Sequence, residues 1–453
     1  MATKEFPLVP QEVPAVETKY RTIRTAIPVP ESIDLLKKLR DLEPRSMGGQ
    51  PPVIWHRGDG VCIHDPYGNK WLDFSSGVLV TSSGHGHKEI VAAITNMAAQ
   101  GMYHAYCFPT EIRGKLVAEL TRLLPAPLKR VFMLTTGSEA VECCIKLAMT
   151  HGRKVGGEGK NIIVSFDNAF HGRTMGSQLA GGSPGLKAWM SEDSRFVQVP
   201  YPDGFRQKDT GFGVFEKALG DKGVDPDDVC GVISETYQGC NACLMPGSYA
   251  QSVRKWCNTH QAVMIFDEVQ AGFGRTGAPF GFSHLGVVPD LVACGKGIAG
   301  GMPVAAVLGT EELMSIYGPG EMTSTHSANP ICAAAGLANL EVLRKEGLVE
   351  NAAKLAPVLA EGCRRITKAS GGKIGHWDST GLVGALQFTK PGTTDPDPAP
   401  AWEIVHRAVG SGVMLFAPVG VGGCAIKINP PLIINEAALR EGLSVLEETA
   451  GQM

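Results

Sequence analysis

Several patterns that would point to particular classes of protein are missing from the sequence. No block of about five or more like charges occurs and the net charge is −3, so we expect neither nucleic acid nor a membrane surface as a partner. The uncharged stretch 412–426 is broken by glycines and a proline and falls short of the roughly 18 apolar residues of a spanning helix. The start, MATKEFPLVPQEVP, lacks the apolar core of a signal peptide. These absences predict a soluble, cytoplasmic protein.

Metal-binding and dinucleotide-binding signatures are also missing. Cys240 and Cys243 form one C-x-x-C pair among 12 cysteines, but no second pair and no H-x-x-x-H follows. One such pair is a weak signal of a metal or redox role, and small buried thiols in a reducing compartment are the simpler interpretation. No G-x-G-x-x-G opens the helix predicted after the strand at 130–136. We therefore expect no resident metal and no dinucleotide cofactor.

The apolar segments that are present predict an α/β fold. The chain has 453 residues and 43% hydrophobic content, enough for a large core in two domains or in one domain with a satellite. Apolar runs alternate with helical patterns at 130–136, 161–166, 230–236, 262–268 and 290–296. Such runs predict a mostly parallel sheet that is covered on both faces and that binds ligands at the carboxyl ends of its strands.

Chemically active side chains follow these predicted strands. The first strand leads into TTGSEAVE, where Thr136 and Glu139 have the spacing of a capping box. Gly137 and Ser138 would then lie at a helix N-terminus, where free N–H groups favour a phosphate, although an ordinary capped helix has the same pattern.

Glu235, Asp267 and Lys296 end three further strands. A buried Asp267 needs a cationic partner, and a salt bridge with Lys296 is one interpretation. The other is that Lys296, with a lowered pKa and glycines on both sides, is a nucleophilic amine for Schiff-base chemistry. A phosphate cup, a carboxylate for a ring nitrogen and such a lysine are the parts of a pyridoxal phosphate site.

At these residues the chain resembles the class III (ω-amino acid type) aminotransferases of fold type I. The resemblance runs from Val53 to near the C-terminus and rests on IFDEVQAGFGRTG (265–277), WLDFSSGVLV, TTGSEAVE, AFHGRT and THSANP, in that family's order of blocks. It implies pyridoxal 5'-phosphate as cofactor. It also implies a large domain with a mostly parallel seven-stranded sheet covered by helices, and a smaller α+β domain built from both termini.

The resemblance also divides the chain into segments. We expect an N-terminal arm and part of the small domain at 1–80, the large cofactor-binding domain at 81–330 and the C-terminal small domain at 331–453. From the residues themselves we expect one helix near 31–40 in the arm and a surface loop at 389–402.

The resemblance assigns cofactor roles to individual residues. Lys296 would carry the cofactor and Asp267 would pair with its ring nitrogen. The remaining cofactor-binding residues would be Gly137 and Ser138 at the phosphate, Phe170 and Val269 on the two ring faces, Gln270 at the ring hydroxyl, His171 beside Phe170, and Thr325 reaching the partner subunit's phosphate. The last role implies a homodimer with shared active sites.

Substrate-binding roles follow from the same resemblance. Arg173 matches an arginine that binds the distal carboxylate in 4-aminobutyrate-type members. Lys427 stands where amino acid transaminases carry an arginine for the α-carboxylate, and Glu235 matches the glutamate that shields this arginine. An ammonium group cannot make the two parallel bonds of a guanidinium, so Lys427 predicts poor use of 2-oxoglutarate. A solvated Lys427 paired with Glu235 is the competing interpretation. Val78, Tyr106, Cys107 and Phe108 are expected to line the pocket.

The predicted reaction is transfer of an amino group from an ω-amine or ω-amino acid to a 2-oxo acid such as pyruvate. An alternative with the same fold and cofactor is a lyase that eliminates ammonia or phosphate from an amino-alcohol phosphate or an aminophosphonate, because AIKINPPL is similar to a segment of such family members. A non-catalytic binding protein or a Rossmann-type reductase is the third possibility, and the missing dinucleotide fingerprint argues against it.

Overall fold

The computed structural model describes residues 5–453 and contains two compact units. The first unit consists of residues up to 87 together with 354–453, and the second consists of residues 88–353. The domains were predicted to divide at 80/81 and 330/331, whereas the units divide at 87/88 and 353/354. The first four residues of the predicted arm lie outside the described residues.

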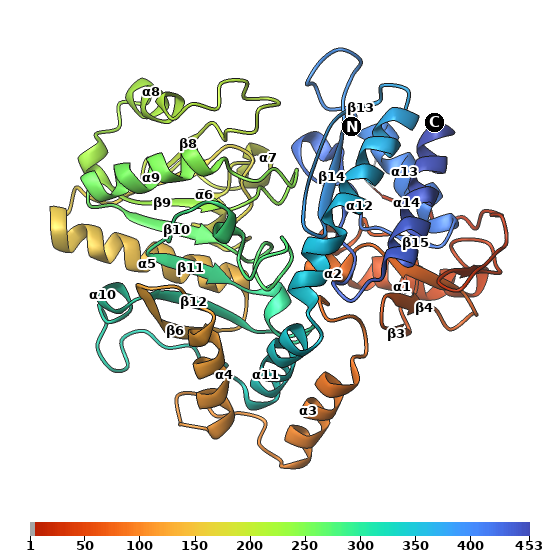
Figure 1. Cartoon of the computed structure of the whole chain (residues 1–453), viewed down its shortest axis with the longest axis horizontal. Helices are drawn as coiled ribbons and strands as arrows, with labels where there is room; N and C mark the ends of the chain where they lie inside the picture. The colour runs from red at the N-terminus through yellow and green to blue at the C-terminus, as the bar shows by residue number, and fades with distance from the viewer. Residues whose placement is uncertain (1–4) are drawn as a thin grey trace. The chain divides into compact units, whose positions relative to one another are not determined.

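A seven-stranded sheet forms the centre of the second unit (Figure 1). Its strand order is β6-β12-β11-β10-β9-β7-β8, and every neighbouring pair from β11 to β8 is parallel. Strand β12 runs antiparallel to both β11 and β6. The strands are β6 Leu128–Leu134, β7 Ile162–Phe166, β8 Phe196–Val199, β9 Val229–Glu235, β10 Val263–Asp267, β11 Leu291–Cys294 and β12 Ala305–Thr310. The predicted mostly parallel sheet is therefore confirmed.

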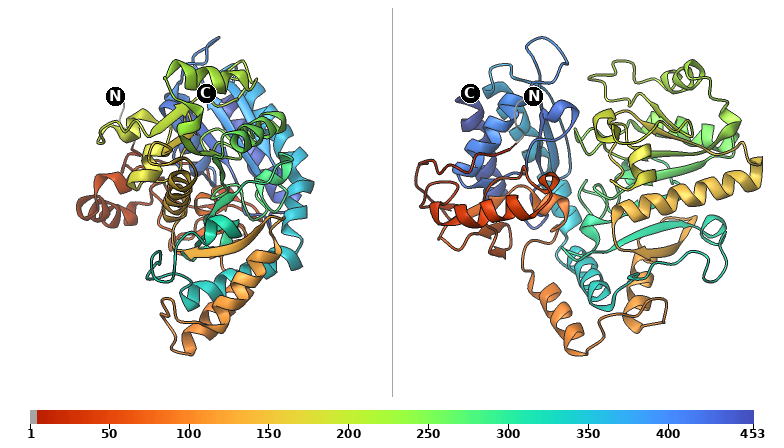
Figure 2. Two further views of the ribbon diagram at one scale, coloured as in Figure 1. Left: turned by 90° about the vertical axis from the view of Figure 1, so that its left-hand side faces the viewer. Right: turned by 180° about the vertical axis from the view of Figure 1, so that it is seen from behind.

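Helices cover both faces of this sheet. Every residue of β9, β10 and β11 is buried, as a sheet covered on both faces requires. Helix α9 lies in front of the sheet in Figure 1, and α5 lies in front of its other face in the rear view of Figure 2. The helices of this unit are α3 Lys88–Ala99, α4 Glu111–Arg122, α5 Gly137–Gly156, α6 Met175–Ala180, α7 Pro184–Lys187, α8 Gly213–Asp221, α9 Gly247–Thr259, α10 Glu311–Met314 and α11 Pro330–Lys345, with 3-10 turns η3 Pro226–Asp228, η4 Gly281–His284 and η5 Lys296–Ile298.

Helix α5 begins at the carboxyl end of β6 with a complete capping box. The Thr136 hydroxyl accepts a hydrogen bond from the Glu139 N–H at 3.3 Å, and the Glu139 carboxylate accepts one from the Thr136 N–H at 2.8 Å. The buried face of the helix includes Val141, Cys144 and Ile145, which pack on the central strands. The cap and the apolar face together place the first residues of α5 at the carboxyl edge of the sheet.

The first unit combines strands from both ends of the chain. One sheet has the order β1-β2-β5-β4-β3, and β15, from the C-terminal part, pairs parallel with β5. A second, antiparallel sheet has the order β13-β14-β16. The strands are β1 Val16–Glu17, β2 Thr22–Ile23, β3 Arg57–Asp59, β4 Cys62–His64, β5 Lys70–Asp73, β13 Ile374–Thr380, β14 Val383–Phe388, β15 Val413–Met414 and β16 Ala425–Ile428. This arrangement agrees with the predicted smaller α+β part built from both termini.

The helices of the first unit pack closely on its strands. A side chain at Gly442 of α14 would meet the Phe74 ring at 2.2 Å, so only a glycine lets the helix approach this ring. The helices are α1 Ile33–Leu42, α2 Ser76–Leu79, α13 Pro398–Gly410 and α14 Glu436–Gly451, and α12 Leu348–Ala369 begins in the second unit; the 3-10 turns are η1 Pro30–Ser32, η2 Arg45–Met47 and η6 Val421–Gly423. No helix among residues 5–453 is both long and apolar enough to cross a membrane.

Two local predictions have different outcomes. The helix predicted near 31–40 is present as η1 and α1. The surface loop predicted at 389–402 is wrong in its last part, because α13 begins at Pro398 and Ala401 is buried. Proline fits the first turn of a helix, where its missing N–H has no partner within the helix.

Candidate active site

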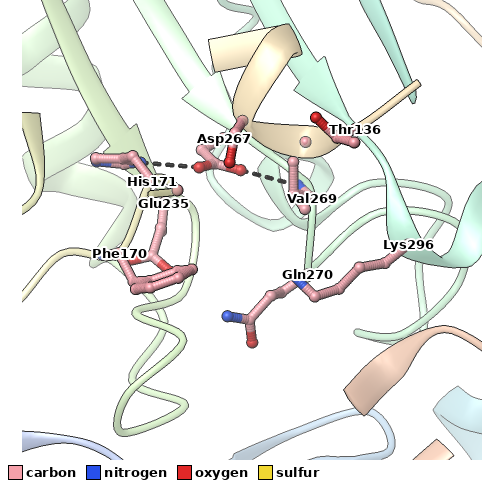
Figure 3. A pocket seen from close by; sticks show the side chains of 11 residues that line it. Thr136, Phe170, His171, Glu235, Asp267, Val269, Gln270 and Lys296 are labelled. Atoms are coloured by element: carbon pink, nitrogen blue, oxygen red, sulfur yellow. Dashed lines mark hydrogen bonds and ion pairs between the residues drawn. The ribbon is translucent and has the colours of Figure 1, made fainter. Parts of the chain in front are cut away.

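A cavity opens in the second unit at the carboxyl ends of β9, β10 and β11 (Figure 3). Its empty volume, which includes the open solvent at its mouth, is about 520 Å³. Its lining residues are Thr136, Gly137, Ser138, Phe170, His171, Gly172, Glu235, Asp267, Val269, Gln270 and Lys296. The sheet thus brings together side chains that lie far apart in the sequence; Thr136 and Lys296 are separated by 160 positions.

Lys296 follows β11 and opens the short turn η5. Its φ is +39°, in the left-handed region that non-glycine residues seldom adopt. Within residues 5–453, the Lys296 ammonium group makes no hydrogen bond or ion pair. Burial lowers the pKa of Lys296, and the negative charges of Asp267 and Glu235 oppose this shift in part. The lowered pKa favours the neutral, nucleophilic amine.

Asp267 ends β10 and is only 5% exposed. One carboxylate oxygen lies 2.8 Å from His171 Nδ1, and the other accepts a hydrogen bond from the Val269 N–H at 3.0 Å (Figure 3). Its ion-pair partner in the described chain is therefore His171, not Lys296 as the salt-bridge interpretation proposed. The carboxylate is held in place while Lys296 stays unpaired.

The contact with Asp267 changes the pKa of His171. Burial alone would lower the pKa of His171, but the hydrogen bond and the negative charge of Asp267 outweigh it and raise the pKa above its usual value. The second ring nitrogen, Nε2, is buried and has no hydrogen-bond partner among the described residues 5–453. The His171 ring therefore has one nitrogen committed to the carboxylate.

Glu235 ends β9 beside this pair and is 4% exposed. Its two carboxylate oxygens accept hydrogen bonds from the Phe170 N–H at 3.1 Å and the Gly239 N–H at 2.9 Å. Burial raises the pKa of Glu235 to about 7, and the nearby negative charge of Asp267 adds to this effect. The group therefore changes its charge near neutral pH.

Glycines shape the part of the cavity next to α5. A Cβ on Gly137 would lie 2.8 Å from Val269 Cγ1, and a Cβ on Gly295 would lie 3.4 Å from the same atom. The start of α5 can therefore approach Val269 this closely only because Gly137 lacks a side chain, whereas a Cβ at Gly295 would make an ordinary van der Waals contact. The first N–H groups of α5 have no acceptor within the helix and can bind a phosphate. These features fit the phosphate and the flat ring of pyridoxal phosphate.

Arg173 lies next to two residues that line the cavity, Phe170 and Ser138. Its guanidinium carbon is 5.7 Å from the centre of the Phe170 ring, and its backbone N–H donates to the Ser138 hydroxyl at 3.3 Å. The Arg173 side chain itself is exposed. A cation thus stands beside two residues that line the cavity.

Several predicted site residues of the second unit are not among those that line the cavity. Tyr106 and Phe108 are 37% and 73% exposed, and Thr325 is exposed on a turn before α11. The pocket roles of Tyr106 and Phe108 and the role of Thr325 stay predictions.

Two further predicted residues belong to the first unit. Lys427 lies in β16 opposite Ala385 of β14 and is 1% exposed, so it is not a solvated surface charge. Val78 is 44% exposed and lies in a left-handed turn, since Ser76, Gly77, Val78 and Leu79 all have φ between 49° and 65°. The proposed substrate roles of Lys427 and Val78 stay predictions.

Sequence reasoning missed two residues that line the cavity, Thr136 and Gly172. Thr136 was identified only as a helix cap, although the residue before a phosphate-binding helix start also faces the ligand. Gly172 has φ +133°, and a Cβ there would lie 2.4 Å from the Ser138 hydroxyl oxygen. Its place in AFHGRT, between two assigned residues, is the signal that could have identified it.

Comparison with known proteins agrees with this geometry. The family model described as Aminotransferase class-III matches residues 45–450. A 4-aminobutyrate aminotransferase of Mycobacterium leprae (strain TN) is 33% identical over 450 residues, which cover 95% of this chain and 98% of that protein. An acetylornithine aminotransferase of Gloeobacter violaceus (strain ATCC 29082 / PCC 7421) is 33% identical over 398 residues, 87% of this chain and 92% of the relative.

A solved structure from the directed evolution of transaminases by ancestral reconstruction superposes with a TM-score of 0.82 at 26% identity, covering 92% of this chain and 98% of the other. The predicted family and fold are therefore confirmed. The chain belongs to the class III aminotransferases, whose cofactor is pyridoxal phosphate and whose substrates are an amine and an oxo acid.

Proposed function

We propose that this aminotransferase takes its amino group from an ω-amine or ω-amino acid and passes it to a 2-oxo acid such as pyruvate. The observation that carries the proposal is the position of Arg173, whose guanidinium lies over the Phe170 ring at the cavity wall. A cation there suits the distal carboxylate of an ω-amino acid, whose amine would then point to Lys296.

The cofactor would be held by the residues that surround the cavity. Lys296 would bind it covalently, the N–H groups of Gly137 and Ser138 would bind its phosphate, and Asp267 would face its ring nitrogen. Val269 and Phe170 would contact the two ring faces, and Gln270 the ring hydroxyl. When bound, the cofactor supplies an electron sink that stabilises negative charge on the substrate carbon bearing the amine.

The protein's own groups would then move and direct the proton. Once displaced by the substrate amine, Lys296 Nζ would take the proton from the substrate carbon and deliver it to the cofactor, which would keep the amino group; the lowered pKa of Lys296 favours this task. His171 would hold the Asp267 carboxylate in one orientation through the 2.8 Å contact. Glu235, fixed by two backbone N–H groups, would adjust the charge of the site near neutral pH.

The relatives support an ω-amine donor. The Mycobacterium leprae relative is named for 4-aminobutyrate, an ω-amino acid, and the Gloeobacter violaceus relative for acetylornithine. Both share 33% identity with this chain, so the identity values favour neither donor. Both names also support transfer of an amino group over the lyase alternative.

Lys427 supports pyruvate over 2-oxoglutarate as acceptor. The resemblance places at this position the arginine that binds an α-carboxylate in amino acid transaminases, and the lysine here is buried in β16. An ammonium group gives one charge-assisted contact where a guanidinium gives two parallel ones. A single contact at this position would bind the α-carboxylate of either 2-oxo acid less tightly, and 2-oxoglutarate would need a further site for its second carboxylate.

A homodimer is the second part of the proposal. The exposed Thr325 would reach the phosphate site of the partner copy. Hydrogen bonds link its segment to the segment before α4, from Asn329 to the Tyr103 carbonyl at 2.5 Å and from Tyr106 to Thr323 at 3.0 Å. That second segment exposes Met102, Tyr103 and Phe108 by 49%, 61% and 73%. Exposed apolar side chains around Thr325 are typical of a surface that another chain covers.

A screen of donors and acceptors tests the reaction. We expect alanine to form from pyruvate with an ω-amino acid donor, and kcat/KM to be at least about tenfold lower with 2-oxoglutarate. Without an acceptor, the absorbance of the bound cofactor should change once and stay changed. Ammonia or phosphate release without any 2-oxo acid would contradict transfer and favour the lyase.

Two donors, one with a distal carboxylate and one without, test whether Arg173 binds that carboxylate. Arg173→Met should lower kcat/KM for 4-aminobutyrate by about tenfold or more, the value of one charge-assisted contact, and leave a simple ω-amine without a carboxylate unaffected. Equal losses with both donors would show that Arg173 does not bind the distal group.

A further inference from the structure

The segment that carries Arg173 is hydrogen-bonded to helix α5 at two points. Ser138 and Glu142 lie four positions apart in α5, so their side chains share one face of the helix. The Ser138 hydroxyl accepts a hydrogen bond from the Arg173 N–H at 3.3 Å. The Glu142 carboxylate accepts one from the hydroxyl of the next residue, Thr174, at 2.6 Å. Helix α5 therefore holds the chain directly before and directly after the Arg173 Cα atom.

Glu142 also caps helix α6, which begins directly after Thr174. Thr174 is the N-cap residue, but in the described chain its hydroxyl accepts no hydrogen bond from the backbone of α6. Glu142 Oε1 instead accepts one from the Ser177 N–H at 3.0 Å. Ser177 is the third residue of α6, where an N-cap side chain usually finds its donor. Helix α6 has only six residues, so its stability depends on tertiary contacts of this kind.

Two glycines let the segment lie directly against these α5 side chains. Gly172 has φ +133°, and a Cβ there would lie 2.4 Å from the Ser138 hydroxyl oxygen. A Cβ on Gly176 would lie 2.4 Å from Glu142 Oε2. Each of the two α5 side chains therefore has a glycine against it, and a larger residue at either position would push the segment away from α5.

We propose that Glu142 is a positioning residue that fixes Arg173 for the distal carboxylate of the amino donor. This inference rests on the proposed function, in which Arg173 binds that carboxylate. Glu142 is not among the residues that line the cavity, so it acts through Arg173 and not on the substrate. Its two hydrogen bonds hold the start of α6, and the start of α6 sets the point from which the Arg173 side chain reaches the Phe170 ring.

The hydrogen bonds of Glu142 suggest a matched pair of variants. One oxygen, Oε1, accepts both of them. A glutamine has one side-chain oxygen and can place it at the same position, so Glu142→Gln keeps both bonds. Methionine has a side chain of similar length and only a weak acceptor, so Glu142→Met loses both. Comparison of the two variants separates the loss of the acceptor from the loss of the charge.

Steady-state kinetics of the holoenzyme with 4-aminobutyrate and with butylamine, which lacks the carboxylate, test the proposal. Glu142→Met should raise KM for 4-aminobutyrate by about fivefold, the factor that corresponds to one ordinary hydrogen bond. Its kcat should stay close to that of the parent, because the distal contact is made equally in the ground state and in the transition state. Kinetics with butylamine should not change, and Glu142→Gln should match the parent with both donors.

Two further measurements locate the effect. In the Arg173→Met background, Glu142→Met should cause no further loss with 4-aminobutyrate, because its effect passes through Arg173. Hydrogen–deuterium exchange of the α6 peptide should be faster in Glu142→Met than in the parent and unchanged in Glu142→Gln. Thr174→Val removes only one of the two donors to Glu142 and should raise the same KM by a smaller factor, which keeps the test decisive if Glu142→Met does not fold.

Three results would overturn the proposal. The first is a parent-like KM for 4-aminobutyrate in Glu142→Met, or in Thr174→Val if Glu142→Met does not fold, while Arg173→Met raises this KM. The second is an equal loss of kcat/KM with both donors, which would indicate a general structural role. The third is a Glu142→Gln variant as impaired as Glu142→Met. Unchanged kinetics of Arg173→Met with 4-aminobutyrate would refute the proposed role of Arg173 itself, and this inference with it.

Discussion

Asp267→Asn should keep the fold and lose nearly all activity. The Asp267 carboxylate accepts one hydrogen bond at each oxygen, from His171 Nδ1 at 2.8 Å and from the Val269 N–H at 3.0 Å. An asparagine side chain has only one acceptor oxygen. That oxygen can keep the Val269 bond while the NH₂ group donates to His171 Nδ1, because a neutral His171 can carry its proton on Nε2 instead. The substitution should therefore cost only about 1 kcal/mol of stability.

The catalytic effect follows from the lost charge. A carboxylate at a hydrogen-bonding distance of about 3 Å from a protonated ring nitrogen contributes about 5 kcal/mol at an effective dielectric constant of about 20. Each 1.36 kcal/mol corresponds to a tenfold change in rate, so loss of the full contribution lowers kcat by about 10³ to 10⁴. An amide cannot keep the ring nitrogen protonated, so the cofactor loses its capacity to accept electrons.

Single-turnover absorbance with an ω-amino acid donor measures the rate, and thermal unfolding of the same sample measures the fold. We expect Tm to fall by a few degrees at most and the rate to fall by at least about a thousandfold. If Asp267→Asn keeps more than about a tenth of the parent rate, Asp267 is only the structural partner of His171.

Three further predictions concern substrate binding, pH and assembly. Lys427→Arg should raise kcat/KM for 2-oxoglutarate by about tenfold to a hundredfold, since one charge-assisted bond contributes about 1.5–3 kcal/mol; an unchanged acceptor preference would contradict the role of Lys427. Glu235 is neutral below its pKa of about 7 and negatively charged above it, where it repels a donor that carries a carboxylate. The kcat/KM of the parent for such a donor, divided by that of Glu235→Gln, should therefore be constant at low pH and fall as the pH rises through about 7. A ratio that does not change with pH would contradict the raised pKa. Sedimentation should show a homodimer, and Thr325→Ala should weaken cofactor binding in it; a fully active monomer would rule out the shared site.

The sequence predicted the large sheet well because its strands are apolar along their whole length. Strands β9, β10 and β11 lie within one or two residues of their predicted ends, and the capping box of α5 is present as predicted. Strand β12 was not among the predicted strands, and its antiparallel direction could not be inferred from composition, because the direction of a buried strand depends on the connection that precedes it.

The arrangement of the candidate site was only partly predictable. Lys296, Asp267 and Glu235 were identified from their positions at strand ends, which fix where a side chain stands but not which group it contacts. The pairing of Asp267 with His171 joins residues 96 positions apart and depends on how the strands lie side by side in the sheet.

The left-handed turn Ser76–Leu79 was beyond sequence reasoning for a different reason. Left-handed backbone costs roughly 1–2 kcal/mol for each non-glycine residue, so local propensity argues against it at Val78 and Leu79. Asp73 holds the entry to the turn by accepting hydrogen bonds from the N–H groups of Ser75 and Ser76 at 2.7 and 3.2 Å. These hydrogen bonds are local to residues 73–76, but they do not show from the sequence that Val78 and Leu79 would also be left-handed.

Borohydride reduction of the holoenzyme, followed by peptide mapping, tests the central claim most directly. Reduction should fix the cofactor to the peptide that contains Lys296, abolish the activity and leave every other lysine unlabelled, because Lys296 is the lysine that lines the cavity beside Asp267. Lys296→Ala should give no labelled peptide and should still bind the cofactor through the start of α5, with turnover lost. A label on any other lysine of the parent enzyme would contradict the account.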